Sequence, residues 1–240
     1  MLRYMKVLAA LGIGLGSLLG YAETSSAQQH PVTAIDVALE PDATMIQRAE
    51  AANARLLKVF PKGFALDATH RPHVTVLQRY VRTADLDKVY AAAGKVLSGE
   101  KVASWKLEAF KYYYIPAGEL GLAGIVVKPT ATLLKLQQQL VAAVAPFTVK
   151  TGAAAAFATT PEDPEINQPT IDYVAAFVPK ATGKNFNPHV TVGIATGDYL
   201  KGMLAEPFDA FTFSPAGASV YQLGNFGTAR EKLKNWELKP

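Results

Sequence analysis

The stretch "RPHVTVLQRY", residues 71–80, shares five consecutive letters with "FNPHVTVGIAT", residues 186–196. The pentapeptide Pro-His-Val-Thr-Val therefore occurs twice, in a chain that has only 4 histidines. A short run of valine and threonine that begins at a proline is typical of a β-strand. The repetition indicates two related strands in an internal repeat, although the two halves of the chain are otherwise only loosely alike.

Side chains alternate between the two faces of a strand, so each copy of the pentapeptide separates into a polar pair and an apolar pair. The polar pairs are His73 with Thr75 and His189 with Thr191. The valines of each copy point the other way, into the core. Along the strand, the imidazole and the hydroxyl of one pair are about 7 Å apart, which leaves room for a tetrahedral anion between them.

If the two strands face one cleft, two imidazoles and two hydroxyls surround a single point. Histidine titrates near neutral pH, so one ring can act as a base while the other acts as an acid. The hydroxyls of the two threonines can donate hydrogen bonds to phosphate oxygens that gain charge in the transition state. Such a site could cleave a phosphodiester without a metal. The sequence does not decide which histidine is the base.

Composition narrows the class of protein. The chain has 240 residues, half of them hydrophobic, which is enough for a proper core. Its net charge of +4 is too small and too scattered to mark a dedicated binder of nucleic acid or anionic membranes. Cysteine is absent, which excludes thiol nucleophiles and zinc–cysteine sites.

The first residues have the layout of a secretory signal peptide. Arg3 and Lys6 precede an apolar run over 7–19, after which the sequence turns small and polar. We predict a signal peptide over 1–27 with cleavage after Ser25-x-Ala27, and Gly20-x-Ala22 as a second choice. The alternative is an uncleaved anchor. In either case the folded part is expected outside the cytoplasm, periplasmic or secreted, with no stable membrane insertion after cleavage.

Periodicity predicts an α+β fold for a single domain over 28–240. Apolar residues at helical spacing predict helices over 41–60, 83–97 (capped by Thr83), from Pro129 onward, 171–178 and 198–204. Strands are expected over 63–67, 71–80, 105–115, 121–127, 188–196, 208–213, 218–225 and 234–239. Because neighbouring strands follow one another, antiparallel sheets are favoured over a doubly wound parallel sheet. Residues 148–187 are read as an irregular surface excursion.

Paired H-x-T motifs, each preceded by proline and held in a strand, resemble the 2H phosphoesterase superfamily, which includes the 2′-5′ RNA ligase and 2′,3′-cyclic phosphodiesterase-like proteins. The stretches "YVAAFVPKATGKNFNPHVTVG" (173–193) and "ASVYQLGNFGTAREKLKNWEL" (218–238) are also similar to their counterparts in such proteins. The resemblance implies a bilobal fold with pseudo-twofold symmetry, in which two antiparallel sheets form a central cleft and helices lie outside.

The resemblance also implies chemistry without a metal or cofactor. His73 and His189 would be the catalytic acid–base pair, and Thr75 and Thr191 would bind phosphate. The expected activity is hydrolysis of a 2′,3′-cyclic phosphate or a related nucleotide or RNA-end phosphodiester. A non-catalytic binding module for phosphorylated ligands is the alternative from another class, and 2′-5′ RNA ligase activity is a third. The oligomeric state does not follow from the sequence.

Other side chains have two interpretations each. Arg71 is interpreted either as a solvent-exposed arginine at a strand end or as a ligand of the substrate phosphate. Base stacking and packing in the sheet both remain open for four aromatic residues: Tyr112, Tyr114, Phe186 and Tyr221. His70 stands three residues before His73, a spacing that puts the two on opposite faces of an extended chain, so no metal site is predicted.

Overall fold

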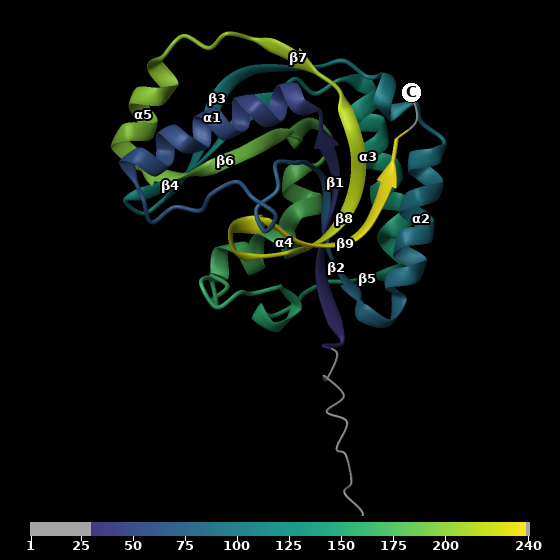
Figure 1. Cartoon of the computed structure of the whole chain (residues 1–240). Helices are drawn as coiled ribbons and strands as arrows, with labels where there is room; N and C mark the ends of the chain where they lie inside the picture. Colours follow the sequence, from purple (N-terminus) through teal and green to yellow (C-terminus); the bar gives the residue numbers. More distant parts are fainter. Residues whose placement is uncertain (1–29, 239–240) are drawn as a thin grey trace, which may run out of the picture.

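The computed structural model describes residues 30–238, so the predicted signal peptide over 1–27 lies outside the described residues. Within the described range, no helix has both the length and the apolar character needed to cross a membrane. The described chain forms a mixed arrangement of strands and helices (Figure 1).

Residues 30–238 contain nine strands and five α-helices, and the predicted α+β class is confirmed. The strands are β1 (Val32–Pro41), β2 (Val74–Arg82), β3 (Leu107–Ala117), β4 (Leu120–Val127), β5 (Thr148–Val149), β6 (His189–Thr196), β7 (Phe211–Phe213), β8 (Pro215–Leu223) and β9 (Ala229–Glu237). The helices are α1 (Ala43–Val59), α2 (Leu86–Ser98), α3 (Ala131–Val144), α4 (Gln168–Ala181) and α5 (Gly197–Ala205).

The two predicted antiparallel sheets are present as two halves of one 9-stranded sheet. One half has the order β7-β3-β4-β6 and the other β2-β1-β8-β9, with β5 beside β2. The halves meet where β2 and β6 pair antiparallel through Val74 and Val190. Each half thus contributes its copy of the repeated pentapeptide to the middle of the sheet, in keeping with the pseudo-twofold relation that the resemblance implies.

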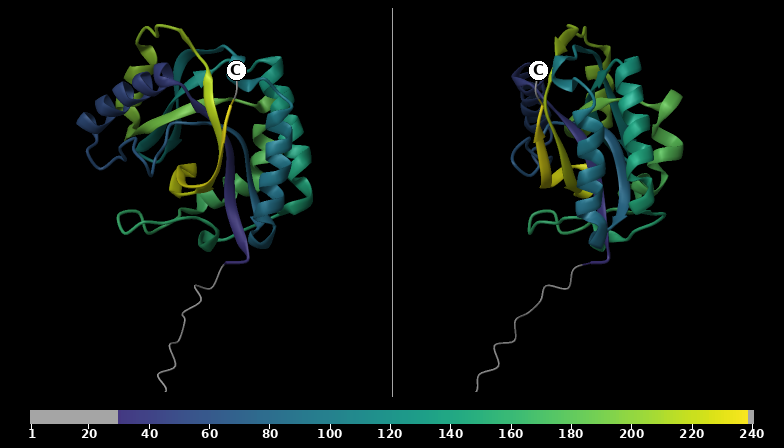
Figure 2. Two further views of the ribbon diagram at one scale, coloured as in Figure 1. Left: turned by 45° about the vertical axis from the view of Figure 1, so that its right-hand side comes forward. Right: turned by 90° about the vertical axis from the view of Figure 1, so that its right-hand side faces the viewer.

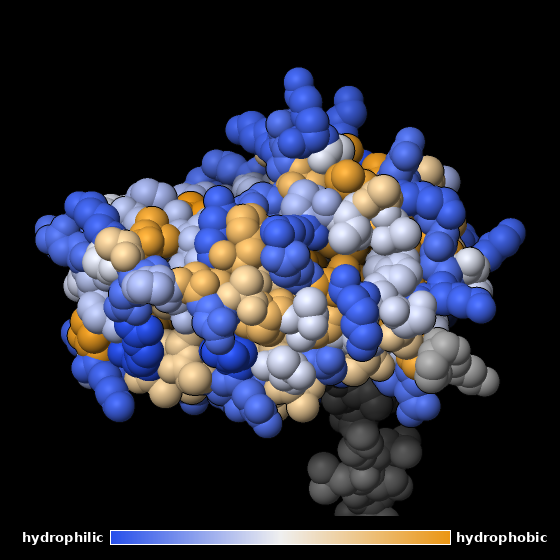
Figure 3. Space-filling view, turned by 90° about the horizontal axis from the view of Figure 1, so that it is seen from above, coloured by the Kyte–Doolittle hydropathy of each residue, from blue (hydrophilic) through white to orange (hydrophobic). Residues whose placement is uncertain are grey.

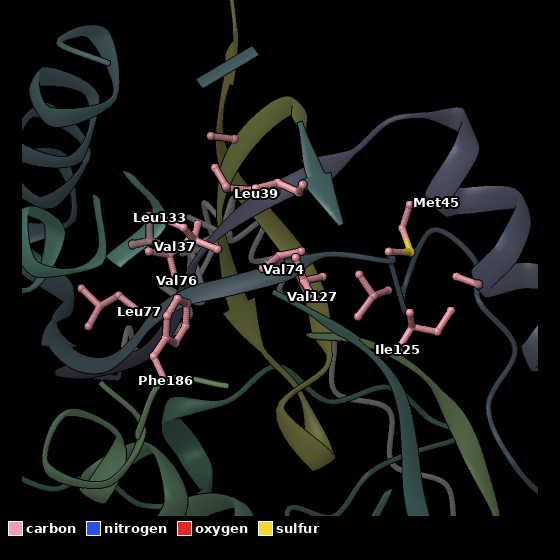
Figure 4. Close-up of a cluster of buried hydrophobic side chains, with 14 of the residues drawn as sticks. Val37, Leu39, Met45, Val74, Val76, Leu77, Ile125, Val127, Leu133 and Phe186 are labelled. Atoms are coloured by element: carbon pink, nitrogen blue, oxygen red, sulfur yellow. The ribbon is translucent and has the colours of Figure 1, made fainter. Parts of the chain in front are cut away.

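The main hydrophobic core joins both halves of the sheet to all five helices. Figure 4 shows part of it, where Val74 and Val76 lie among side chains from β1, β4 and α3. Helices α2 and α3 lie side by side along one flank (Figure 2). On the face seen from above, hydrophilic side chains cover most of the surface, with smaller apolar areas between them (Figure 3). The valines of both pentapeptides are buried in the main core, as predicted.

Strand β1 was not expected from the sequence. Nearly every residue of Val32–Pro41 is buried, so the strand lacks the alternation of apolar and polar residues that marks a half-exposed strand. The strand expected over 63–67 was wrong, because this segment is irregular. Thr83 does not cap α2 either; its hydroxyl donates a hydrogen bond to the His30 carbonyl at 2.5 Å.

The excursion over 148–187 is less of a surface feature than the sequence indicated. Its helix, α4, spans 14 residues, and Phe157 and Val174 pack against Tyr80 of β2 in a second, smaller apolar cluster. The excursion is also tied to β9, because Arg230 of this strand donates a hydrogen bond to Asp163. The excursion therefore covers part of the sheet instead of standing away from it.

A buried glutamine connects three elements next to the second motif. The Gln137 amide on α3 donates to the Val76 carbonyl of β2 at 3.1 Å and to the Ala181 carbonyl at the end of α4 at 3.3 Å. Its Oε1 accepts a hydrogen bond from the Gly183 amide at 3.1 Å. The side chain thus holds the chain that leads into β6 against β2.

We predict that Gln137→Ala lowers the free energy of unfolding by about 1–3 kcal/mol, because it leaves buried backbone groups without partners. Gln138→Ala is the matched control, since Gln138 lies on the exposed side of the same helix. Urea denaturation of both variants measures the difference. Equal stability of the two variants would contradict this role for Gln137.

Candidate active site

The β2–β6 pairing places the four polar side chains of the two motifs on one face of the sheet. With Val74 opposite Val190, the antiparallel register continued by one residue sets His73 beside Thr191 and Thr75 beside His189. Directly opposed residues point to the same face. His73 of one motif and Thr191 of the other accordingly line one pocket, so the two motifs meet at a single site.

Both histidines are held in the same way. The His73 Nδ1 lies 2.7 Å from the Arg71 carbonyl oxygen, and the His189 Nδ1 lies 2.7 Å from the Asn187 carbonyl oxygen. A carbonyl oxygen only accepts, so Nδ1 carries the proton and donates it in each case. The proline between the two bonded residues restricts the backbone in both motifs. Nε2 is left in each ring as the atom that can exchange a proton with a ligand.

Sequence reasoning missed one polar residue of the site, Asp36. It lies on β1 and is fully buried, and its Oδ2 is 3.5 Å from the His73 Nε2. The same oxygen accepts hydrogen bonds from the Thr75 hydroxyl at 2.6 Å and from the Gln78 amide at 3.0 Å. The available signal was an acidic residue inside the apolar run over 32–39, because an acidic side chain is rarely buried unless it is paired with another group.

The hydroxyls of the two threonines differ in their hydrogen bonding. The Thr75 hydroxyl has one proton, and it donates this proton to Asp36. The hydroxyl of Thr191 makes no hydrogen bond to any residue in the range 30–238, and Thr191 lines the pocket. As the site stands, Thr191 is the threonine whose hydroxyl is ready to donate to a ligand.

The two imidazoles also differ in their affinity for a proton. Burial acts to lower the pKa of His73, but the contact with Asp36 and its charge, aided by the Arg71 carbonyl and Glu40, raise this pKa above its ordinary value. Desolvation lowers the pKa of His189 to about 4, although the Asn187 carbonyl and the charge of Asp36 act to raise it and the charge of His73 acts to lower it. His73 therefore holds its proton to a higher pH than His189 does.

The pocket at the first motif has a volume of about 260 Å³, including the space open to solvent. Arg71 lines it, which places a charged donor where a phosphate ligand would need one. His70 lines it as well, stacked on Phe64 with the ring centroids 4.7 Å apart. The prediction that His70 and His73 occupy opposite faces was wrong, because residues 70–72 precede β2 and do not follow the alternation of a strand.

The β3 tyrosine that lies beside the site is not one of the two that the sequence singled out. Tyr112 and Tyr114 pack against the main core, and Tyr112 meets Phe208 edge to face. Tyr113, on the opposite face of the strand, lies beside His189 with the ring centroids 4.7 Å apart. The ring that borders the site on this side is thus that of Tyr113.

Two further aromatic residues are too buried to stack on a ligand. Phe186 packs in the main core, where Figure 4 shows it next to Leu77. Tyr221 is fully buried; its hydroxyl donates to Glu40, and its ring centroid is 6.1 Å from that of His73. The base-stacking interpretation fails for both residues, and Tyr221 instead forms part of the wall behind His73.

Among residues 30–238, no group of three or more histidine and acidic side chains is arranged to hold a metal ion. The groups that the site does offer are two imidazoles, a hydroxyl donor and Arg71.

Comparison with known proteins gives a likeness of fold. No family model matches the chain, and no curated protein matches it. The structure is similar to that of TT0787 of Thermus thermophilus, with 15% sequence identity, coverage of 86% of this chain and 98% of that chain, and a TM-score of 0.52. E. coli LigT complexed with ATP has 12% identity, coverage of 87% and 99%, and a TM-score of 0.42. Usb1 of Kluyveromyces marxianus has 11% identity, coverage of 88% and 98%, and a TM-score of 0.40.

The chain shares its overall fold with TT0787 of Thermus thermophilus. Because the identity to TT0787 is 15%, this likeness shows the fold alone.

The difference between the two imidazoles can be tested without a substrate. We predict that in an NMR titration of the folded protein the His189 ring titrates near pH 4, because this half-buried ring is desolvated and lies near the charge of His73. The His73 ring is expected to titrate above its ordinary range, because Asp36 stabilises its charged form. Identical midpoints for His73 and His189 would contradict the arrangement.

Proposed function

We propose that the protein is a metal-independent phosphodiesterase that hydrolyses a 2′,3′-cyclic phosphate or a related nucleotide or RNA-end phosphodiester. The observation that carries this proposal is the register of β2 and β6, which brings both H-x-T motifs to one face beside one pocket. Two imidazoles of unlike proton affinity at one site are what general acid–base catalysis requires.

The proposed reaction uses groups that the chain itself supplies. One imidazole takes a proton from water as the water attacks phosphorus, and the other protonates the departing oxygen. The Thr191 hydroxyl and Arg71 are positioned at the pocket to stabilise the charge that develops on the phosphate oxygens. Acid and base must flank phosphorus for in-line displacement, which explains why one motif alone would not suffice.

Turnover of a substrate panel tests the proposal. The mature protein is incubated, with chelator present, with 2′,3′-cyclic nucleotides and with 2′-5′-linked dinucleotides. We predict hydrolysis that survives chelation and that falls by about 10²–10⁴-fold in His73→Ala and in His189→Ala, because each variant lacks a proton-transfer group. His30→Ala is the control, since His30 is exposed at the start of the described chain.

Other outcomes of the same panel separate the alternatives. Binding without turnover across the panel would replace the enzyme by a binding module for phosphorylated ligands. Formation of 2′-5′ linkages from RNA ends, without hydrolysis, would favour the ligase. Neither result is expected, because His73 and Thr191 line one pocket and the His189 imidazole lies near His73.

We also propose that the protein acts outside the cytoplasm, on the strength of the basic, apolar and small-residue order of residues 1–27. Expression of the full chain in a bacterial host, followed by fractionation and N-terminal sequencing, tests this. A mature N-terminus at residue 28 in the periplasm or medium is expected. An unprocessed chain in the cytoplasm would contradict export, and an unprocessed chain in the membrane fraction would identify an anchor.

A further inference from the structure

We propose that Asp36 assigns the roles of the two histidines, so that His73 is the acid and His189 the base. The inference rests on the proposed function and deepens it. Asp36 is here a positioning residue, because it acts on the substrate only through His73. Nothing in the repeated pentapeptide distinguishes the two histidines; the distinction comes from β1, whose carboxylate contacts one ring and not the other.

The charged and titratable groups around the two rings are unequal. His73 faces Asp36 and Glu40 of β1, and the Tyr221 ring of β8 lies behind it. The ring of His189 lies against Tyr113 of β3, and in the range 30–238 it forms no ion pair with a carboxylate. Positive charge is therefore stabilised on the first imidazole, and the second is kept neutral by its surroundings.

The contacts of Asp36 fit this role. Its Oδ2 accepts hydrogen bonds from the Thr75 hydroxyl and the Gln78 amide. A carboxylate can only accept hydrogen bonds, so these two contacts fit a carboxylate at this position. Its Oδ1 is buried and has no hydrogen-bond partner among residues 30–238. A buried carboxylate in this condition needs a neighbouring cation, and the only side chain paired with it there is His73.

The distance between the two groups also suits an acid that must give up its proton. The His73 Nε2 and the Asp36 Oδ2 are 3.5 Å apart, which is long for a hydrogen bond. The carboxylate therefore stabilises the charge of the imidazolium without holding the Nε2 proton in a strong bond. This proton remains available to an oxygen bound in the pocket that His73 lines.

The proton and electron balance follows from these roles. The His189 Nε2 takes a proton from water, and the water oxygen forms a bond to phosphorus. The bond from phosphorus to the leaving oxygen breaks, its electron pair stays on that oxygen, and the His73 Nε2 protonates it. One water is consumed, and the two imidazoles return to their starting states by exchanging protons with solvent. Because the Thr75 proton is used by Asp36, phosphate binding falls to Thr191.

The leaving group distinguishes an acid from a base. An ester that releases a ribose hydroxyl needs the acid, whereas an aryl ester such as a p-nitrophenyl nucleotide diester leaves without protonation. We expect His73→Ala to lose at least about 100-fold on the ribose ester but less than about tenfold on the aryl ester. His189→Ala should lose activity on both. The reverse pattern would overturn the assignment, and equal losses for both variants on both esters would also overturn it.

The role of Asp36 has its own test, in Asp36→Asn, which keeps the shape and the acceptor oxygen. This variant should lose more activity on the ribose ester than on the aryl ester, as His73→Ala does, but by a smaller factor. The alkaline limb of its pH–rate profile should move to lower pH, because His73 then loses its proton more readily. Independently of any activity, NMR titration should show the His73 midpoint moving to lower pH. Glu40→Gln is the control, because the charge of Glu40 is already paired with Lys232 and its removal should shift His73 less.

An unchanged His73 midpoint in folded Asp36→Asn would overturn the role of Asp36. If that variant does not fold, the leaving-group comparison of His73→Ala with His189→Ala still decides the assignment. If the unmodified protein cleaves none of the esters, the proposed function fails, while the titration of Asp36→Asn still reports whether Asp36 governs the charge of His73. The two failures are therefore distinguishable.

Discussion

The pairing of β2 with β6 is the contact on which the site depends. Val74 and Val190 are the residue pair at which the two halves of the sheet join, and their side chains are fully buried in the common core. The same backbone pairing that buries the valines presents the neighbouring histidines and threonines together on the other face. A shift of the register by one residue would separate the histidines from one another and expose the valines. Folding and site assembly are thus one event.

Identical sequences do not make identical halves. Each Pro-His-Val-Thr-Val copy fixes its histidine in the same way, through a hydrogen bond from Nδ1 to a carbonyl two residues earlier. The rings differ because different strands lie beside them. Strand β1 brings Asp36 to the first motif, whereas β3 brings Tyr113 to the second. The symmetry of the backbone supplies two imidazoles, and the asymmetry of their neighbours gives them different proton affinities.

The sequence was informative where a local pattern governs the structure. Strand alternation places His73 and Thr75 together, and helical spacing located α1 and α3. It failed where burial removes the pattern, as in β1, and with it Asp36 was missed. Phe186, just before β6, and Tyr221, in β8, could not be placed, because the sequence around an aromatic residue looks the same whether the ring faces a ligand or the core. Which face of β3 borders the site depends on its pairing with β4 and β7, which no local pattern encodes.

The central claim is that the two motifs form one site. Titration of the protein with inorganic phosphate at constant pH, followed through the imidazole signals of His73 and His189, tests this most directly. A single site predicts that both signals shift with one common dissociation constant, and that Thr191→Val, which removes the hydroxyl at the pocket, weakens both responses together. Shifts of only one imidazole, or two unrelated dissociation constants, would show that the motifs act separately and would contradict the account.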